Sequence, residues 1–184
     1  MKNLLVVVAL IGLVAFSANA QGKISFGVGV DFALPMSSGF SDSQNFGIGG
    51  TAKVYYPFND MITFTGTAGY ITFSGKDYTV FGTTVKAGSW NMIPVVVGGR
   101  YYFMPATASM RFYGAFDMGL IFGSYTTPDQ VIFGVKVSGG SVSTTDFTYQ
   151  PAVGFEASKF DVAVRLLGVS GATCVAARVG YIFN

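Results

Sequence analysis

The sequence predicts an all-β fold, an eight-stranded antiparallel up-and-down barrel that crosses a membrane. Three observations favour this fold. Large apolar side chains alternate with small or polar ones along much of the chain, which is the pattern of strands whose two faces differ. Only 11% of the residues are charged, against about 25% in an average soluble domain. After residues 5–13, no apolar run approaches the ~18 residues that a spanning helix needs, which leaves a closed barrel as the membrane solution.

The first twenty residues have the pattern of a cleavable signal peptide. Lys2 provides a positive start, residues 4–14 an apolar core, and Ala18-Asn19-Ala20 a small-residue cleavage site. The alternative is an amphipathic or spanning helix that stays attached, but the apolar core is short for a span. We therefore expect removal of residues 1–20, export to the periplasm, and one β-barrel domain over residues 21–184.

The strand over residues 23–34 shows the alternation most clearly. One face carries Ile24, Phe26, Val28, Val30, Phe32 and Leu34, and the other carries Lys23, Ser25, Gly27, Gly29, Asp31 and Ala33. Bulky apolar groups on one side and small or charged groups on the other are typical of a strand with lipid outside and a packed polar interior.

The rest of the chain repeats this pattern. We expect strands at 46–56, 62–73, 90–103, 110–122, 145–157, 160–169 and 172–183. The connections alternate between long and short, as expected for external loops and periplasmic turns, although the last external connection at 170–171 is brief. Aromatic residues at strand ends predict two belts at the membrane surfaces. The periplasmic belt would contain Tyr56, Tyr101, Phe103, Phe160, Tyr181 and Phe183, and the external belt Phe32, Phe46, Tyr70, Trp90, Phe122 and Phe147.

Charged residues within the strands support the same orientation. Eleven lie in the expected strands, and all face inward: Lys23, Asp31, Lys53, Arg100, Arg111, Asp117, Asp146, Glu156, Asp161, Arg165 and Arg178. A charge facing lipid at mid-depth costs roughly 2–4 kcal/mol. We expect Arg111, Glu156, Asp161 and Arg178 to lie side by side near the periplasmic end. Together with Arg100, Lys53, Asp117 and Arg165 they would form an ion network, because buried charges require partners.

Other classes of protein fit less well. A soluble lipocalin-like barrel or a β-sandwich would place the bulky face inside, where an eight-stranded barrel has too little room. Residues 47–52 match a dinucleotide fingerprint in letters, but they fall inside a strand. The chain has no histidine, which excludes Ser-His and His-metal chemistry, and we expect neither an enzyme nor a cofactor. The net charge is only +2 and the basic residues do not cluster, so the sequence offers no basic surface that would bind nucleic acid. The single cysteine, Cys174, is expected to be an inward-facing filler.

Several short stretches resemble a known family: Ile93-Pro94-Val95 leading into residues 99–103, then residues 151–156, and the terminal residues 178–183. They are similar to the small eight-stranded outer-membrane barrel superfamily, which includes the OmpA transmembrane domain, OmpX and the OmpW-like proteins. The resemblance implies residence among the lipids of the bacterial outer membrane. It also implies insertion by the barrel-assembly machinery, which reads a terminal aromatic strand, although here Asn184 follows the aromatic. Lipid A-modifying enzymes of the superfamily depend on histidine, which this chain lacks.

For function, the resemblance implies surface contact or passage of small apolar solutes, and the sequence favours contact. Residues 75–86 and 130–138 alternate in the β fashion although they lie in the expected external loops 74–89 and 123–144. We expect the flanking strands to extend beyond the membrane and to offer a sheet edge to an external partner. The alternatives are a narrow channel or lateral-exit conduit, which Arg100, Arg111, Tyr113, Arg165 and Arg178 would plug, and a purely structural barrel.

Overall fold

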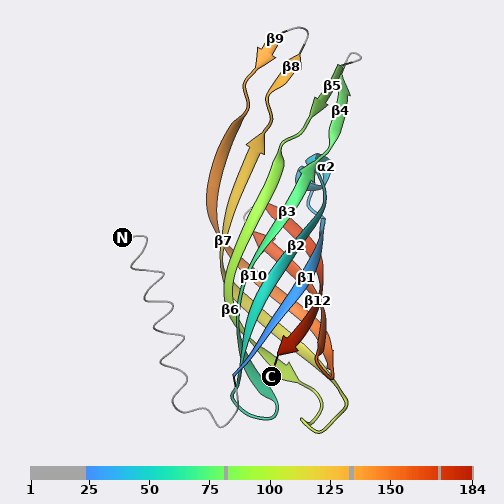
Figure 1. Ribbon diagram of the computed structural model, residues 1–184, viewed down its shortest axis with the longest axis vertical. Helices are drawn as coiled ribbons and strands as arrows, with labels where there is room; N and C mark the ends of the chain where they lie inside the picture. The colour runs from blue at the N-terminus through green and yellow to red at the C-terminus, as the bar shows by residue number, and fades with distance from the viewer. Residues whose placement is uncertain (1–23, 81–82, 133–134, 170, 184) are drawn as a thin grey trace, which may run out of the picture.

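The computed structural model describes residues 24–80, 83–132, 135–169 and 171–183, and its long strands close into one antiparallel barrel (Figure 1). Eight strands follow one another around the barrel in the order β1-β12-β11-β10-β7-β6-β3-β2. Their bounds are β1 Ser25–Pro35, β2 Gln44–Pro57, β3 Ile62–Gly75, β6 Ser89–Tyr102, β7 Met110–Thr127, β10 Gly140–Ala157, β11 Phe160–Val169 and β12 Ala172–Phe183. The predicted eight-stranded barrel is confirmed. The predicted signal peptide, Lys23 and Asn184 lie outside the described residues.

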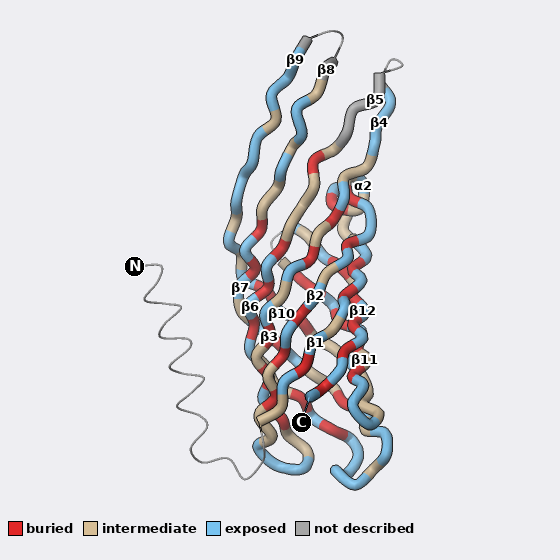
Figure 2. Tube along the Cα trace, in the orientation of Figure 1, coloured by how far each residue is buried: buried red, intermediate tan, exposed pale blue. Residues whose placement is uncertain are grey.

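The two faces of the strands are those that the sequence predicts. In β1, Phe26 is 58% exposed whereas Asp31 is fully buried. The same alternation runs along the other barrel strands and is visible as bands of buried and exposed residues (Figure 2). Large apolar side chains therefore cover the outside, and polar and charged side chains point into the interior. Among the described residues, no helix is long and apolar enough to cross a bilayer.

The long connections contain the additional strand structure that the alternation of residues 75–86 and 130–138 predicts. The segment 123–144, expected to be a loop, is largely β structure: β7 continues to Thr127 and β10 begins at Gly140, and the two stay paired throughout. Between them lie β8 (Gln130–Ile132) and β9 (Val135–Val137). The segment 74–89 likewise contains the hairpin β4 (Asp77–Val80) and β5 (Thr83–Lys86). Both ribbons project from one end of the barrel (Figure 1).

The first external connection folds back over the barrel mouth. Residues 35–45, which connect the first two expected strands, contain one helical turn, α2 (Phe40–Ser43). Gly39 precedes this turn with a positive φ of 82°, a conformation that favours glycine. The Nζ of Lys76 donates to the carbonyl of Ser41 at 2.7 Å and ties α2 to the base of the neighbouring hairpin. This arrangement directs Phe40 into the interior, where it is buried.

Candidate functional site

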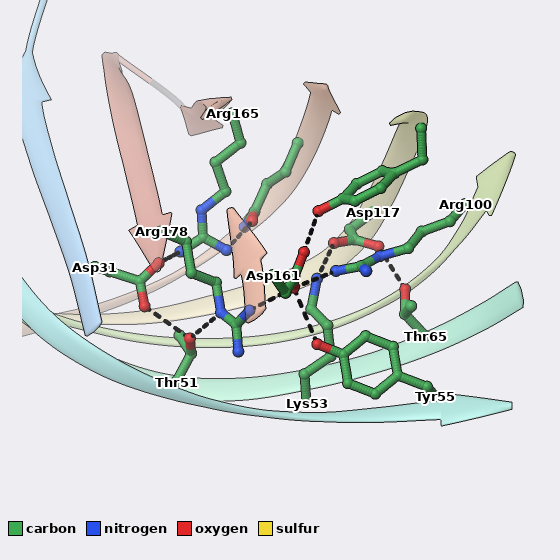
Figure 3. A network of polar contacts seen from close by, with 12 residues as sticks. Asp31, Thr51, Lys53, Tyr55, Thr65, Arg100, Asp117, Asp161, Arg165 and Arg178 are labelled. Atoms are coloured by element: carbon green, nitrogen blue, oxygen red, sulfur yellow. Dashed lines mark hydrogen bonds and ion pairs between the residues drawn. The ribbon is translucent and has the colours of Figure 1, made fainter. Parts of the chain in front are cut away.

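A buried ion network centred on Asp161 (Figure 3) lies in the half of the interior nearer the short connections, which the sequence analysis assigns to the periplasmic side. The side chain of Asp161 is fully enclosed. It accepts hydrogen bonds from Arg178 Nη1 at 2.6 Å and Arg100 Nη2 at 2.7 Å. The hydroxyls of Tyr55 and Tyr113 also donate to it, at 3.0 and 2.5 Å. Five strands thus converge on one carboxylate, which satisfies the requirement that a buried charge be paired and hydrogen-bonded.

Arg100 joins Asp161 to a second carboxylate. Its Nη1 donates to Glu156 Oε1 at 2.6 Å, and the hydroxyl of Tyr102 donates to the same oxygen at 2.7 Å. The guanidinium carbon of Arg100 lies 4.2 Å from the centroid of the Tyr113 ring. Since planar guanidinium groups stack on aromatic faces, the tyrosines hold Arg100 both by packing and by shared acceptors.

Two further groups continue the network toward the middle of the barrel. Asp31 accepts from Arg165 Nη2 and from the hydroxyl of Thr51, both at 2.7 Å. Thr51 in turn accepts from Arg178 Nε at 2.9 Å, which links this group to Asp161. In the second group, Lys53 Nζ lies 3.4 Å from Asp117 Oδ2. The hydroxyl of Thr65 donates to the other Asp117 oxygen at 2.9 Å.

Among the eight residues predicted for the network, only Arg111 lies apart from the ion pairs. It stands opposite Glu156 in the β7–β10 register. However, its guanidinium donates to the backbone carbonyl of Asp60 in a periplasmic turn and lies over the Tyr102 ring. Arg100 occupies the place beside Glu156 instead. Residue spacing along the strands could not reveal this, because a long arginine side chain can reach an acceptor several strands away.

Glycines on the inner face leave the space that the long side chains fill. A Cβ at Gly29 would lie 2.8 Å from Arg178 Cζ, and one at Gly180 would lie 2.5 Å from Arg178 Nη1. A Cβ at Gly154 would lie 2.5 Å from the hydroxyl oxygen of Tyr113. These distances are shorter than van der Waals contact. Small residues were predicted for this face, and the side chains of Arg178 and Tyr113 pack directly against their backbone.

The other half of the interior, toward the long connections, contains an apolar cluster that the sequence did not predict. Its buried side chains are Ala33, Phe40, Ile71, Phe73, Met92, Ile121, Leu167, Cys174 and Ala176. The Phe40 ring makes edge contacts with Phe73 and Trp90, at centroid distances of 5.3 and 5.9 Å. The assignment of Trp90 to the external lipid-facing belt was therefore wrong. Trp90 is two residues from the inward-facing Met92, and the period of two places both on the inner face.

A second candidate site is the projecting edge of β10. This strand pairs with β7 from Gly140 to Ala157, but its register with β11 begins only at Tyr149. The backbone of residues 140–148 is thus paired on one side only within the part of the chain that the structure describes. Most of residues 140–147 are exposed. The β7 side of the ribbon is enclosed, because β7 pairs with β6 as far as Thr126.

The described residues offer no candidate metal site. No group of three or more His, Cys, Asp or Glu side chains there could hold a metal ion.

Comparison with known proteins shows a shared fold at low identity. No protein-family model matches the sequence, and no curated protein matches it. The solved structure of Ail, the attachment invasion locus protein of Yersinia pestis, is 16% identical with a TM-score of 0.54, over 88% of this chain and 99% of that one. The N-terminal β-barrel domain of Pseudomonas aeruginosa OprF is 16% identical with a TM-score of 0.52, over 89% of this chain and 100% of that one. Neisserial surface protein A is 14% identical with a TM-score of 0.57, over 86% of this chain and 95% of that one.

Proposed function

We propose that this chain, a small eight-stranded barrel of the bacterial outer membrane, has a closed lumen and contacts external surfaces through its projecting hairpins. The observation that carries the proposal is the free edge of β10 over residues 140–148. Membrane residence follows from the physical character of the outer surface. Phe, Val, Leu, Ile and Met side chains lie exposed along every barrel strand, and water would not support such a surface.

The free edge of β10 is suited to strand addition. An unpaired strand edge presents a row of N–H and C=O groups that can pair with an extended segment of another protein. Proteins usually blunt such edges with prolines or lysines. Residues 140–147 contain neither, Asp146 is the one charged residue among them, and most of the other side chains are small or hydroxylated. Pairing would therefore meet little steric or electrostatic opposition, and an external protein with an extended segment is the partner that fits.

The interior supports a closed lumen. The ion network fills the periplasmic half with Arg100, Arg178 and their tyrosine partners, all buried. Above it, the apolar cluster with Phe40 fills the external half. Eight-stranded barrels usually enclose a bore that side chains fill. A protein without an open passage has to act through its surfaces, which is why a contact role is favoured.

The names of two proteins that share the fold agree with a surface role. One is an attachment invasion locus protein and the other is a surface protein. These names describe those proteins, and the shared fold makes contact a reasonable proposal for this chain.

The test uses proteoliposomes that carry the barrel and a fluorescent lipid, applied to a monolayer of epithelial cells. Deletion of residues 128–142 should reduce retention while the barrel stays folded. Ser141→Lys adds a charge on the free-edge strand, and Thr126→Lys adds the same charge directly opposite it on the enclosed strand β7. Retention should fall with Ser141→Lys and change little with Thr126→Lys. Unchanged retention after the deletion would contradict the contact role and favour a purely structural barrel.

A narrow or lateral-exit conduit for a small apolar solute is the second candidate. The observation in its favour is an interruption of the β10–β11 pairing at Gln150 and Pro151, between the pairs Tyr149–Gly168 and Ala152–Arg165. Proline cannot donate to the ladder, so the seam between these strands is weakened there. Planar-bilayer recording separates the two functions. A closed lumen passes no steady current, and a sustained conductance would favour the conduit.

A further inference from the structure

The hairpin of β11 and β12 ends well before the neighbouring strand β10 does. Val169 and Ala172 form the last pair of this hairpin, and both pack against the apolar cluster inside the barrel. β10 extends beyond Tyr149, its last partner position with β11, by residues 140–148, which is about 30 Å of strand. The free edge of β10 therefore lies beyond the end of the short hairpin, where a longer β11 would otherwise run.

The inner face of this free edge carries a carboxylate without a partner. Asp146 shares this face with the buried residues Thr148 and Gln150, because the ladder with β7 continues without a register shift. Asp146 is half-buried, and no hydrogen bond or ion pair reaches it from the described residues. Directly opposite on β7 is Ile121, a member of the apolar cluster. The enclosed side of the strand thus gives this charge no compensation, which a partly buried charge requires.

A second polar group on the same face also lacks a partner. Thr144 lies two residues from Asp146, about 7 Å along the strand. Its Oγ1 is buried and makes no hydrogen bond within the part of the chain that the structure describes. Opposite it is Gly123, which has no side chain to reach it. Arg165, the cation of β11, already donates to two other side chains of the interior. A strand placed along the free edge is in position to supply what both groups lack.

The charge of the occupant follows from cross-strand pairing. A residue directly across from Asp146 on an added strand would have its Cβ about 5 Å away, where an opposite charge is favourable and a like charge unfavourable. A long side chain there also reaches the diagonal neighbour, Thr144. Lysine and arginine meet both conditions. A second copy of this chain paired edge to edge does not, because residues 140–148 contain neither.

We propose that the segment that adds to β10 carries a lysine or arginine directly across from Asp146. The external partner is then a protein with a basic residue within an extended, β-prone stretch. This inference rests on the proposed strand addition to β10, and it adds the charge and the position by which one extended segment is preferred over another.

The test measures the binding of fluorescent nine-residue peptides to the full-length mature barrel in lipid nanodiscs, by fluorescence anisotropy. The peptides have the sequence Thr-Val-Thr-Val-X-Val-Thr-Val-Thr with a solubilising polyethylene glycol tail, where X is lysine, norleucine or glutamate. The uniform flanks let X find the register across from Asp146. A fourth peptide has proline on either side of the lysine, so it keeps the charge but cannot form a continuous ladder.

Three variants of the barrel accompany the wild type. Asp146→Asn removes the charge at nearly constant size, and Asp146→Lys reverses it. Asp77→Asn is the matched control, because it removes the same charge from an exposed position of the other projecting hairpin, on β4. Heat-modifiable mobility and circular dichroism verify that each variant is folded.

We expect the wild type to bind the lysine peptide about fivefold more tightly than the norleucine peptide, the effect of one favourable cross-strand charge pair. The glutamate peptide should bind most weakly. Asp146→Asn should lose the preference for lysine, and Asp77→Asn should keep it. Asp146→Lys should prefer the glutamate peptide, a reversal that a merely structural role of Asp146 would not produce.

The outcomes separate this inference from the proposed function. Equal affinity for the lysine and norleucine peptides, with no binding of the proline peptide, would overturn the charge requirement and leave strand addition standing. Equal binding of the proline and lysine peptides, or no binding of any peptide, would overturn strand addition and this inference with it. A dimer that forms without peptide and is lost with Ser141→Lys would identify a second copy as the occupant and would also overturn the inference.

Discussion

The guanidinium group of Arg178 lies flat against the backbone of Gly29 on the neighbouring strand. A Cβ at position 29 would come within 2.8 Å of Arg178 Cζ. This contact spans the seam between the first and last strands, since Gly29 pairs with Gly180 across β1 and β12. The arginine can reach Asp161 and Thr51 together because both glycines lack side chains.

Gly29→Ala is therefore expected to destabilise the barrel by about 1–3 kcal/mol, the usual effect of overpacking. Gly50→Ala is the matched control. Gly50 faces outward on β2, and a Cβ there would meet its nearest atom at an ordinary 3.6 Å. Urea unfolding in lipid vesicles, followed by the fluorescence of the single tryptophan, measures both. Equal unfolding midpoints would contradict the close packing of Arg178.

Asp161→Asn should reduce the stability of the barrel more than Gly29→Ala does. The change removes the shared carboxylate of Arg100 and Arg178 and leaves two buried guanidinium groups short of charge. Breaking a buried pair in this way costs about 3–5 kcal/mol. Asp60→Asn, in an exposed periplasmic turn, should leave stability nearly unchanged. The same urea titration compares them, and similar losses in the two variants would show that the network does not stabilise the fold.

Phe40→Ala should open the apolar cluster at the external mouth. Phe40 packs against Trp90, so its removal should shift the tryptophan emission to the red and increase quenching by acrylamide. The loss of stability should be smaller than the ~3–5 kcal/mol typical of a central phenylalanine, because α2 lies at the rim. Met36→Ala in the same connection, where Met36 is 62% exposed, should change neither signal. An unchanged spectrum for Phe40→Ala would mean that α2 does not cover Trp90 in solution.

Val97→Arg tests the membrane orientation. Val97 is 65% exposed on the outward face of β6. An arginine there should reduce stability in vesicles by about 2–4 kcal/mol if it lies near mid-depth in hydrocarbon. Met104→Arg, in the turn after β6, should have little effect because its side chain can reach water. A smaller loss for Val97→Arg than for Met104→Arg would contradict the orientation.

The sequence predicted the barrel because its physical cause is repeated in every strand. Successive side chains of a strand point to opposite faces, so the alternation alone places Asp31 inside and Phe32 outside. Each further strand shows the same alternation and so supports the same orientation. The inward orientation of the described strand charges could be predicted for the same reason, since lipid excludes them. The extension of the strands that flank residues 123–144 could be predicted from the alternation of residues 130–138, but their exact bounds could not, because the composition of this segment is that of a loop whereas the ladder between β7 and β10 continues through it.

The details of the interior could not be predicted in this way. Whether Arg100 or Arg111 meets Glu156 depends on side-chain reach across the lumen, which strand spacing does not contain. Phe40 enters the barrel from a connection, where no periodicity marks its direction. The missed network members include Asp31, which pairs with Arg165, and the hydroxyls of Tyr55, Tyr102 and Tyr113. The inward position of these tyrosines was readable from the alternation, and a buried hydroxyl usually has a partner.

The pairing of Asp31 with Arg165 has a consequence for how the molecule forms. Asp31 belongs to the first strand and Arg165 to the seventh, and they become neighbours only when the sheet rolls up and its two margins meet. Until that moment neither of these two charges has the other, and their partners on the adjacent strands, Thr51 for Asp31 and Gln150 for Arg165, are neutral. Electrostatic compensation thus arrives at the final step of assembly, so an incompletely rolled intermediate gains little from it and the finished cylinder resists opening along that margin.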